Sequence, residues 1–177
     1  MVFIAKLLVL ALTAAATPIL RRDATTVQND ITQKMGPQIT QLNNDVSGFP
    51  ASGLTGALAI NNDVQELVSI VKNTISDIQN TGSFGTVSGT TILADIQNLV
   101  PTFLATLVTL DSQYEAWAGI PGGTALVLSN LQSLNTVFTD FTNAVNAAEP
   151  FFLKPGGIAI QTQITAAFTT AIAEYSV

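Results

Sequence analysis

Apolar residues recur every three or four positions along most of the chain, which is the spacing of one face of an α-helix. Five segments show this period, at residues 27–49, 54–78, 92–117, 127–148 and 160–175. Turns rich in Gly with Pro or Ser separate them at 48–53, 81–85, 119–123 and 154–157. Alternation with period two never lasts more than a few residues, so strands are not expected. The pattern predicts an all-α, up-and-down bundle of about five antiparallel helices, a fold that can enclose an apolar cavity.

Two prolines lie within the periodic segments. Gly36-Pro37 interrupts the first segment, and we expect a kink or a break there because proline donates no helical hydrogen bond. Pro101 lies in the third segment, where the apolar period resumes without a phase shift. We therefore expect that helix to bend at Pro101 and to continue as far as Trp117.

The N-terminal residues have the features of a secretory signal. Lys6 precedes an apolar run at 7–12, and alanines at 14–16 offer a cleavage site. The run is shorter than the roughly 20 residues that span a bilayer, so no transmembrane segment is expected. Arg21-Arg22 has the form of a dibasic processing site. We expect a signal peptide at 1–16, a propeptide at 17–22 and a single helical-bundle domain at 23–177.

Composition excludes many functions. The chain has no Cys and no His, which removes disulfides, thiol nucleophiles, Cys/His zinc sites and histidine-based catalysis. Charged residues make up 10%, against roughly 25% in an ordinary chain. The net charge is −6, and three lysines against twelve acids would give −9 after residue 22. Such acidity argues against nucleic acid as a partner.

Carboxylates are the remaining candidates for catalysis. Asp111 and Glu115 are four residues apart, and Asp63 and Glu66 are three apart, so each pair shares a helix face. Solvated surface acids explain both pairs more simply. We expect no enzymatic activity, no catalytic residue, no metal site and no cofactor.

The apolar faces supply candidates for binding a hydrophobic molecule. The apolar cavity candidates are Val71, Ile75, Phe103, Leu107, Leu110, Leu134, Phe138, Phe141, Ile164 and Phe168. Each of these side chains could instead be ordinary core packing. Thr74, Thr106 and Thr142 lie at helical spacing from these residues and could bind a polar head group. Alternatively, their hydroxyls bond to carbonyls one turn back.

Four phenylalanines lie beside turns instead of on a helix face. Phe151 and Phe152 precede Leu153, in a segment flanked by Pro150 and Pro155. This segment could form a mobile lid or an exposed adhesive tip, or it could fold its aromatic rings back over the end of the bundle. Phe49 and Phe84 are the other two.

The order and spacing of the apolar residues resemble those of a known family. The relevant stretches are Ile31-x3-Met35-x3-Ile39-x2-Leu42, Ile96-x2-Leu-Val-Pro101-x-Phe103-Leu104, Leu131-x2-Leu134-x3-Phe138-x2-Phe141 and Ala147-Ala-Glu-Pro150. Together with the N-terminal signal they resemble the fungal hydrophobic surface-binding protein family, also called the cell-wall galactomannoprotein family. The resemblance implies a secreted or wall-associated helical bundle. Some members adsorb to hydrophobic surfaces, and others enclose a fatty acid.

Two functions remain open at this point. The first is a secreted lipid-binding protein that sequesters a long-chain fatty acid in the bundle. The alternative is a cell-wall or surface-adsorbing structural protein that coats hydrophobic surfaces and recruits secreted hydrolases. An enclosed cavity would bind a few ligands saturably, whereas an adhesive patch would adsorb in proportion to area. A homodimer formed by exchange of the first helix is also conceivable, given the break expected at Gly36-Pro37.

Overall fold

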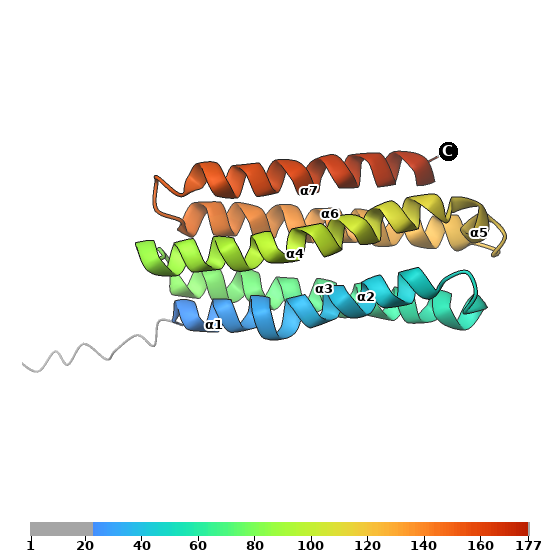
Figure 1. Ribbon diagram of the computed structural model, residues 1–177, viewed down its shortest axis with the longest axis horizontal. Helices are drawn as coiled ribbons and strands as arrows, with labels where there is room; N and C mark the ends of the chain where they lie inside the picture. The colour runs from blue at the N-terminus through green and yellow to red at the C-terminus, as the bar shows by residue number, and fades with distance from the viewer. Residues whose placement is uncertain (1–22, 177) are drawn as a thin grey trace, which may run out of the picture.

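The computed structural model describes residues 23–176, which form five long helical segments lying antiparallel along one axis (Figure 1). The first segment is a continuous series of α1 (Ala24–Asn29), η1 (Asp30–Met35) and α2 (Gly36–Gly48). The others are α3 (Gly53–Thr81), α4 (Thr86–Ser112), α6 (Gly123–Ala148) and α7 (Lys154–Tyr175), with a short α5 (Tyr114–Ala118) after α4. The predicted all-α bundle is confirmed. The signal peptide and propeptide predicted at 1–22 lie outside the described residues.

The long helices pack as a closed ring. In the order α2, α3, α6, α7, α4, each helix contacts the next, and α4 contacts α2. Because packed helices lie about 8–10 Å apart, a ring of five has a wider centre than a ring of four. Large side chains pointing inward from several helices must fill that centre.

Of the kink or break predicted at Gly36-Pro37, the break does not occur. The helix runs through both residues, and the irregularity lies in the turn before them, where Asp30–Met35 form a π-helix. Proline removes one helical donor, and its ring displaces the carbonyl one turn back. A single wider turn accommodates such a residue without ending the helix.

Pro101 does not end α4, as predicted, but the helix stops earlier than the apolar period indicates. α4 ends at Ser112, and Trp117 lies in the separate α5. The physical reason is Gln113, whose Nε2 donates to the carbonyls of Val46 and Phe49 at 2.8 and 2.6 Å. α4 thus ends directly before Gln113, whose side chain donates hydrogen bonds to the carbonyl groups at the C-terminal end of α2. The expectation of one helix up to Trp117 is therefore wrong.

α4 is the most apolar of the long helices. By length and composition it could cross a membrane, with a mean hydropathy of 1.4 over its best window, of which 33% is buried. In the bundle α4 lies between α2 and α7. Its inward face includes the buried Ile92, Ile96, Val100, Phe103 and Leu107. The absence of a transmembrane segment stays a prediction.

Candidate functional site

Four phenylalanines meet at the centre of the ring, and we call them the phenylalanine cluster: Phe103, Phe138, Phe141 and Phe168. The rings of Phe103 and Phe138 stack with centroids 4.5 Å apart. Phe168 meets Phe103 edge-on at 5.6 Å, and Phe141 meets Phe138 edge-on at 6.3 Å. Each of the four is at most 3% exposed. The structure therefore unites side chains of α4, α6 and α7 that are up to 65 positions apart in the sequence.

The other apolar candidates are buried, except one that is only partly buried. Val71, Leu107, Leu110, Leu134 and Ile164 are all buried, as predicted for an inward face. Ile75 is different, because it is only partly buried. It lines an open groove of about 330 Å³ between α3 and α6, beside Lys72 and Asp140. Ile75 therefore lies at the margin of the inward face, packed against the core, and its part in ligand binding stays a prediction.

The three candidate threonines are buried, but their hydroxyls already have partners. Thr74 donates to the carbonyl of Ile70 at 3.0 Å, and Thr142 donates to that of Phe138 at 3.0 Å. Thr106 lies 2.9 Å from the carbonyl oxygen of Thr102 and 3.1 Å from Asn43 Oδ1. These are the intrahelical bonds that threonine commonly makes. Each hydroxyl oxygen can still accept a bond, but donation to a ligand would break an existing one.

The seam between α4, α6 and α7 contains a small apolar cavity. Its volume is about 10 Å³, and its lining is Leu93, Ile96, Thr142, Val145, Asn146, Gly157 and Ile160. Pockets that hold small ligands usually measure about 300–1,000 Å³. A long apolar guest would therefore have to displace side chains along this seam.

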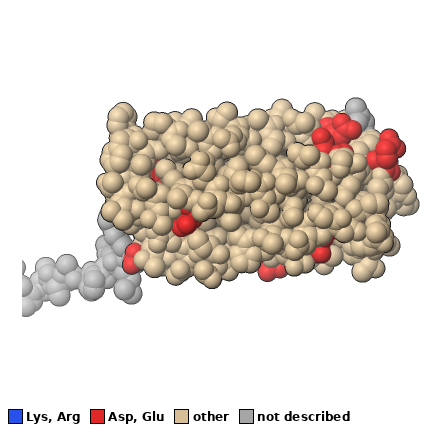
Figure 2. Space-filling model, viewed as in Figure 1, with Lys and Arg blue, Asp and Glu red and all other residues tan. Residues whose placement is uncertain are grey.

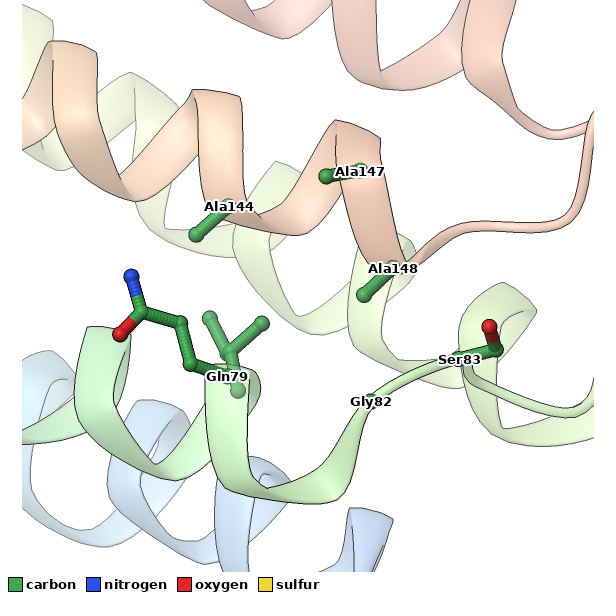
Figure 3. Close-up of a pocket in the computed structure, with 7 residues that line it drawn as sticks. Gln79, Gly82, Ser83, Ala144, Ala147 and Ala148 are labelled. Carbon is green, nitrogen blue, oxygen red and sulfur yellow. The ribbon is translucent and has the colours of Figure 1, made fainter.

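A larger pocket opens at the end of the bundle where α3 and α6 finish (Figure 3). It measures about 310 Å³ and is lined by Ile78, Gln79, Gly82, Ser83, Ala144, Ala147 and Ala148. Figure 3 shows Gln79 reaching from α3 toward the alanines of α6. Sequence reasoning missed this pocket. The sequence feature that could have revealed it is the set Ala144, Ala147 and Ala148, which share one face of α6. Small side chains on one helix face leave space beside a neighbouring helix.

The turn between α6 and α7 exposes two aromatic rings. Phe151 is 88% exposed and Phe152 is 61% exposed, so this segment forms an outward tip and does not fold over the bundle. Phe49 and Phe84, the other phenylalanines beside turns, are buried. Phe49 stacks on Trp117 with centroids 4.3 Å apart. We call Phe151 and Phe152 the exposed tip.

The visible face of the bundle carries few charges (Figure 2). Carboxylates appear mainly toward its right end and lower edge, with a further patch inside the left part of the face, and no lysine or arginine is seen among the described residues on that face. Most of the surface formed by α2, α4 and α7 is therefore uncharged. Such a surface approaches an apolar phase with little cost of desolvating charge.

Two acidic side chains, Asp63 and Glu149, are less exposed than a solvated surface acid. Asp63 was expected to be a solvated acid, but it is partly buried and accepts a hydrogen bond from Gln38 at 3.2 Å. Burial, with Asp45 beside it, raises the pKa of Asp63 to about 6. Glu149 is 4% exposed, and burial raises its pKa to about 7.

Asp30 is a third carboxylate with little exposure. Asp30 is buried in the π-helical turn, where Lys34 pairs with it. Burial is the main cause that raises the pKa of Asp30, and Asp77 contributes to it. Over residues 23–176 no group of three or more Asp and Glu side chains is arranged to hold a metal ion.

Comparison with known proteins identifies relatives of this chain. A family model described as hydrophobic surface binding protein A matches residues 24–147, from α1 to the end of α6. No curated protein sequence matches the chain.

Several solved structures share the fold. The chain superposes with a TM-score of 0.82 on Afmp4p in complex with palmitic acid, at 24% identity, covering 87% of this chain and all of that one. Ligand-binding domain 1 of the Penicillium marneffei MP1 protein, complexed with arachidonic acids, gives 0.79 at 17% identity, covering 88% of this chain and 100% of the domain. Domain 2 of that protein, also complexed with arachidonic acids, gives 0.78 at 15% identity, covering 89% and 98%. At these identities the likeness establishes the fold.

Proposed function

The chain belongs to the hydrophobic surface binding protein A family, and from that premise we propose that it is a secreted protein that sequesters a long-chain fatty acid inside its helical bundle. The observation that carries the proposal is the phenylalanine cluster, an apolar centre in a five-helix ring. Solved structures of the same fold include complexes with palmitic and arachidonic acids. The alkyl chain would lie among the buried candidates in the seam between α4, α6 and α7.

Elementary energetics support an apolar ligand without any ion pair. Burying a chain of sixteen carbons contributes about 12 kcal/mol gross, at roughly 0.8 kcal/mol per methylene. Association costs on the order of 4–15 kcal/mol, and separating stacked rings costs a further ~0.5–1.5 kcal/mol for each pair. Contacts between the alkyl chain and the displaced rings offset part of that last cost. A useful affinity therefore depends on how readily the seam opens.

Export and processing belong to the same proposal. We expect cleavage after residue 16 and after Arg22, which would leave a mature chain that begins at Asp23 and carries a net charge of −9. The mature protein would reside outside the cell or in the cell wall, with no catalytic role. Sequencing the N-terminus of the secreted protein tests both cleavages.

Native mass spectrometry during titration with palmitate tests the main proposal. We expect saturation at one or two equivalents. Ile164 is buried on α7 and Ile158 is 53% exposed on the same helix, so the two offer a matched pair. Ile164→Trp should fill the seam and abolish binding, whereas Ile158→Trp should leave binding intact. Circular dichroism checks that both variants fold, and equal palmitate binding by both would contradict an interior site.

Adsorption to hydrophobic surfaces is a second candidate function, and the exposed tip is the observation that favours it. Two aromatic rings project into solvent at one end of a bundle that has few charged residues. Replacing both with serine should reduce retention on hydrophobic beads several-fold. The matched control is the double replacement of Leu54 and Leu58 by serine, since these side chains are also exposed, at 63% and 55%. Equal retention of the two variants would contradict a role for the tip. Recruitment of hydrolases stays a prediction.

A further inference from the structure

Glu149 is a buried carboxylate with no hydrogen-bond partner. It follows α6 directly, and both side-chain oxygens are inaccessible and unbonded. Buried polar atoms almost always have a partner, and a buried carboxyl group without one is costly. In a binding protein, such an atom indicates a place where a ligand completes the bonding.

Gly89 provides the space that Glu149 occupies. It lies in the first turn of α4, and a methyl group there would overlap Glu149 Oε2 and touch Leu153. The carboxyl group therefore lies against bare backbone at the start of α4. The amide of Phe84 donates to the carbonyl of Ala148 at 2.8 Å, which holds this end of α6 beside the turn that precedes α4.

A second unbonded oxygen lies one turn away along the same seam. Asn146 Oδ1 is buried without a partner and faces Gly157 on α7. Asn146 and Gly157 both line the small cavity of the seam, together with Leu93, which lies one turn beyond Gly89. The seam thus has polar oxygens at its outer end and apolar side chains further in.

We propose that Glu149 binds the carboxylate head group of a long-chain fatty acid at the outer end of the α4/α6/α7 seam. This inference rests on the proposed function and assigns the head group to a residue outside the threonine candidates. Glu149 lies eleven positions from Phe138 on the same helical path, or about 16 Å at 1.5 Å per residue. An extended sixteen-carbon chain with its head at Glu149 reaches the phenylalanine cluster.

The chemistry requires one proton shared between two carboxyl groups. A protonated Glu149 donates its O–H to the ligand carboxylate, and charge-assisted bonds of this kind are short and strong. When Glu149 is ionised, the two groups repel each other and binding weakens. The burial that raises the pKa of Glu149 to about 7 keeps it protonated in weakly acidic solution.

Charged groups on the surrounding elements do not alter this expectation. The charged residues on these elements are Asp95 and Asp111 on α4, Asp140 on α6, Lys154 and Glu174 on α7, and Asp63, Glu66, Lys72 and Asp77 on α3. Among the described residues, burial is the cause that raises the pKa of Glu149, with no contribution from these charges. The pH dependence of head-group binding should therefore follow Glu149.

Palmitate titrations at pH 5.5 and pH 8 test the proposal, with methyl palmitate as the uncharged probe. Wild-type affinity for palmitate should fall about tenfold or more between the two pH values. Glu149→Gln keeps a donor at both pH values, so its palmitate affinity should change less than about threefold. Methyl palmitate binding should depend on neither pH nor Glu149.

Gly89→Ala provides an independent variant that retains Glu149. Its methyl group should push the carboxyl group out of the seam and weaken palmitate binding at pH 5.5, with methyl palmitate unaffected. Circular dichroism verifies the fold of both variants. Valine at Thr74, Thr106 and Thr142 provides the contrast, and it should leave the pH dependence of palmitate binding unchanged.

Three results would overturn the assignment in distinguishable ways. If palmitate and methyl palmitate bind equally to every variant at both pH values, the bundle binds lipid and Glu149 is not the head-group site. If the threonine variants lose the preference for palmitate and the Glu149 variant keeps it, the head group binds at the threonines. If neither lipid binds the wild type, the proposed function itself fails.

Discussion

The ring of Phe103 stacks on that of Phe138 with the two planes 28° apart and the centroids 4.5 Å apart. The two residues belong to α4 and α6, and Phe168 from α7 packs against both. Their contact fills the centre of the ring of helices. A lipid-binding function for this bundle therefore requires these rings to separate, and an alkyl chain would take the place of their mutual contact.

Removing one ring of this pair should lower the free energy of unfolding, and bound palmitate should restore part of it. Phe138→Ala should lower the free energy of unfolding by about 3–5 kcal/mol, because it leaves a buried cavity. Saturating palmitate should recover part of this loss by filling the cavity. Urea denaturation with and without palmitate measures both effects.

The control for this variant is Phe151→Ala. Phe151 is 88% exposed, so its replacement should change stability by no more than about 0.5 kcal/mol. A loss below about 1 kcal/mol for Phe138→Ala would contradict a tightly packed centre.

Adjacent glycines in the first turn of α7 should respond oppositely to alanine. A Cβ at Gly156 would meet Leu93 at 3.6 Å, an ordinary contact, so Gly156→Ala should stabilise the helix by up to about 1 kcal/mol. A Cβ at Gly157 would overlap Asn146 Oδ1. Gly157→Ala should displace Asn146 and break its 3.1 Å bond to Gln161, which costs about 1 kcal/mol.

Thermal unfolding of both glycine variants measures this difference. The melting temperature should rise for Gly156→Ala and fall for Gly157→Ala. A rise of similar size in both variants would contradict the close approach of α6 and α7 at Gly157.

Stability should fall as pH rises from about 4 to 8. The folded state raises the pKa of Asp63 to about 6 and of Glu149 to about 7, so it binds protons more tightly than the unfolded chain. The stabilisation is complete below the ordinary carboxyl pKa and is lost as pH passes through the raised values. Glu149 alone accounts for about 3 kcal/mol at most. Urea midpoints measured across this pH range test the slope.

Glu149→Gln should flatten that pH profile. Glu115 is exposed, and Glu115→Gln should leave the profile as it is in the wild type. If stability instead rises steadily from pH 4 to pH 8, the burial of these carboxyl groups in the folded protein is wrong.

A side-chain hydrogen bond joins the C-terminal end of α7 to α4. The hydroxyl of Tyr175 donates to the carbonyl of Leu110 at 2.7 Å. Tyr175→Phe should cost about 1 kcal/mol and speed amide exchange in the last turns of α7. Tyr114→Phe removes the same atom from the neighbouring ring, 5.3 Å away between centroids, and should have a smaller effect. Equal effects would contradict the importance of this bond.

The apolar period predicted the helices well because a helix in this bundle has one inward stripe. It placed Val71, Phe103, Phe138 and Phe168 in the core, where burial confirms them. The period could not separate Ile75 from its neighbours, since Ile75 lies on the side of α3 that borders α6 and an open groove. Which part of a wide stripe faces the centre depends on where the neighbouring helices lie.

Other features depend on partners distant in sequence. α4 ends at Ser112 because Gln113 bonds to carbonyls more than sixty residues away. Glutamate side chains are rarely buried without a partner. Glu149 is buried because Gly89, sixty positions earlier, leaves room for it. The spacing of apolar and polar residues within one helix cannot predict contacts between residues that are sixty or more positions apart.

The most direct test of a fatty acid inside the bundle is an isotope-filtered nuclear Overhauser experiment with ¹³C-labelled palmitate. The account predicts cross-peaks from the alkyl methylenes to the ring protons of Phe103, Phe138 and Phe168. Cross-peaks confined to Phe151 and Phe152, with none to the phenylalanine cluster, would contradict it and place the lipid on the outside of the protein.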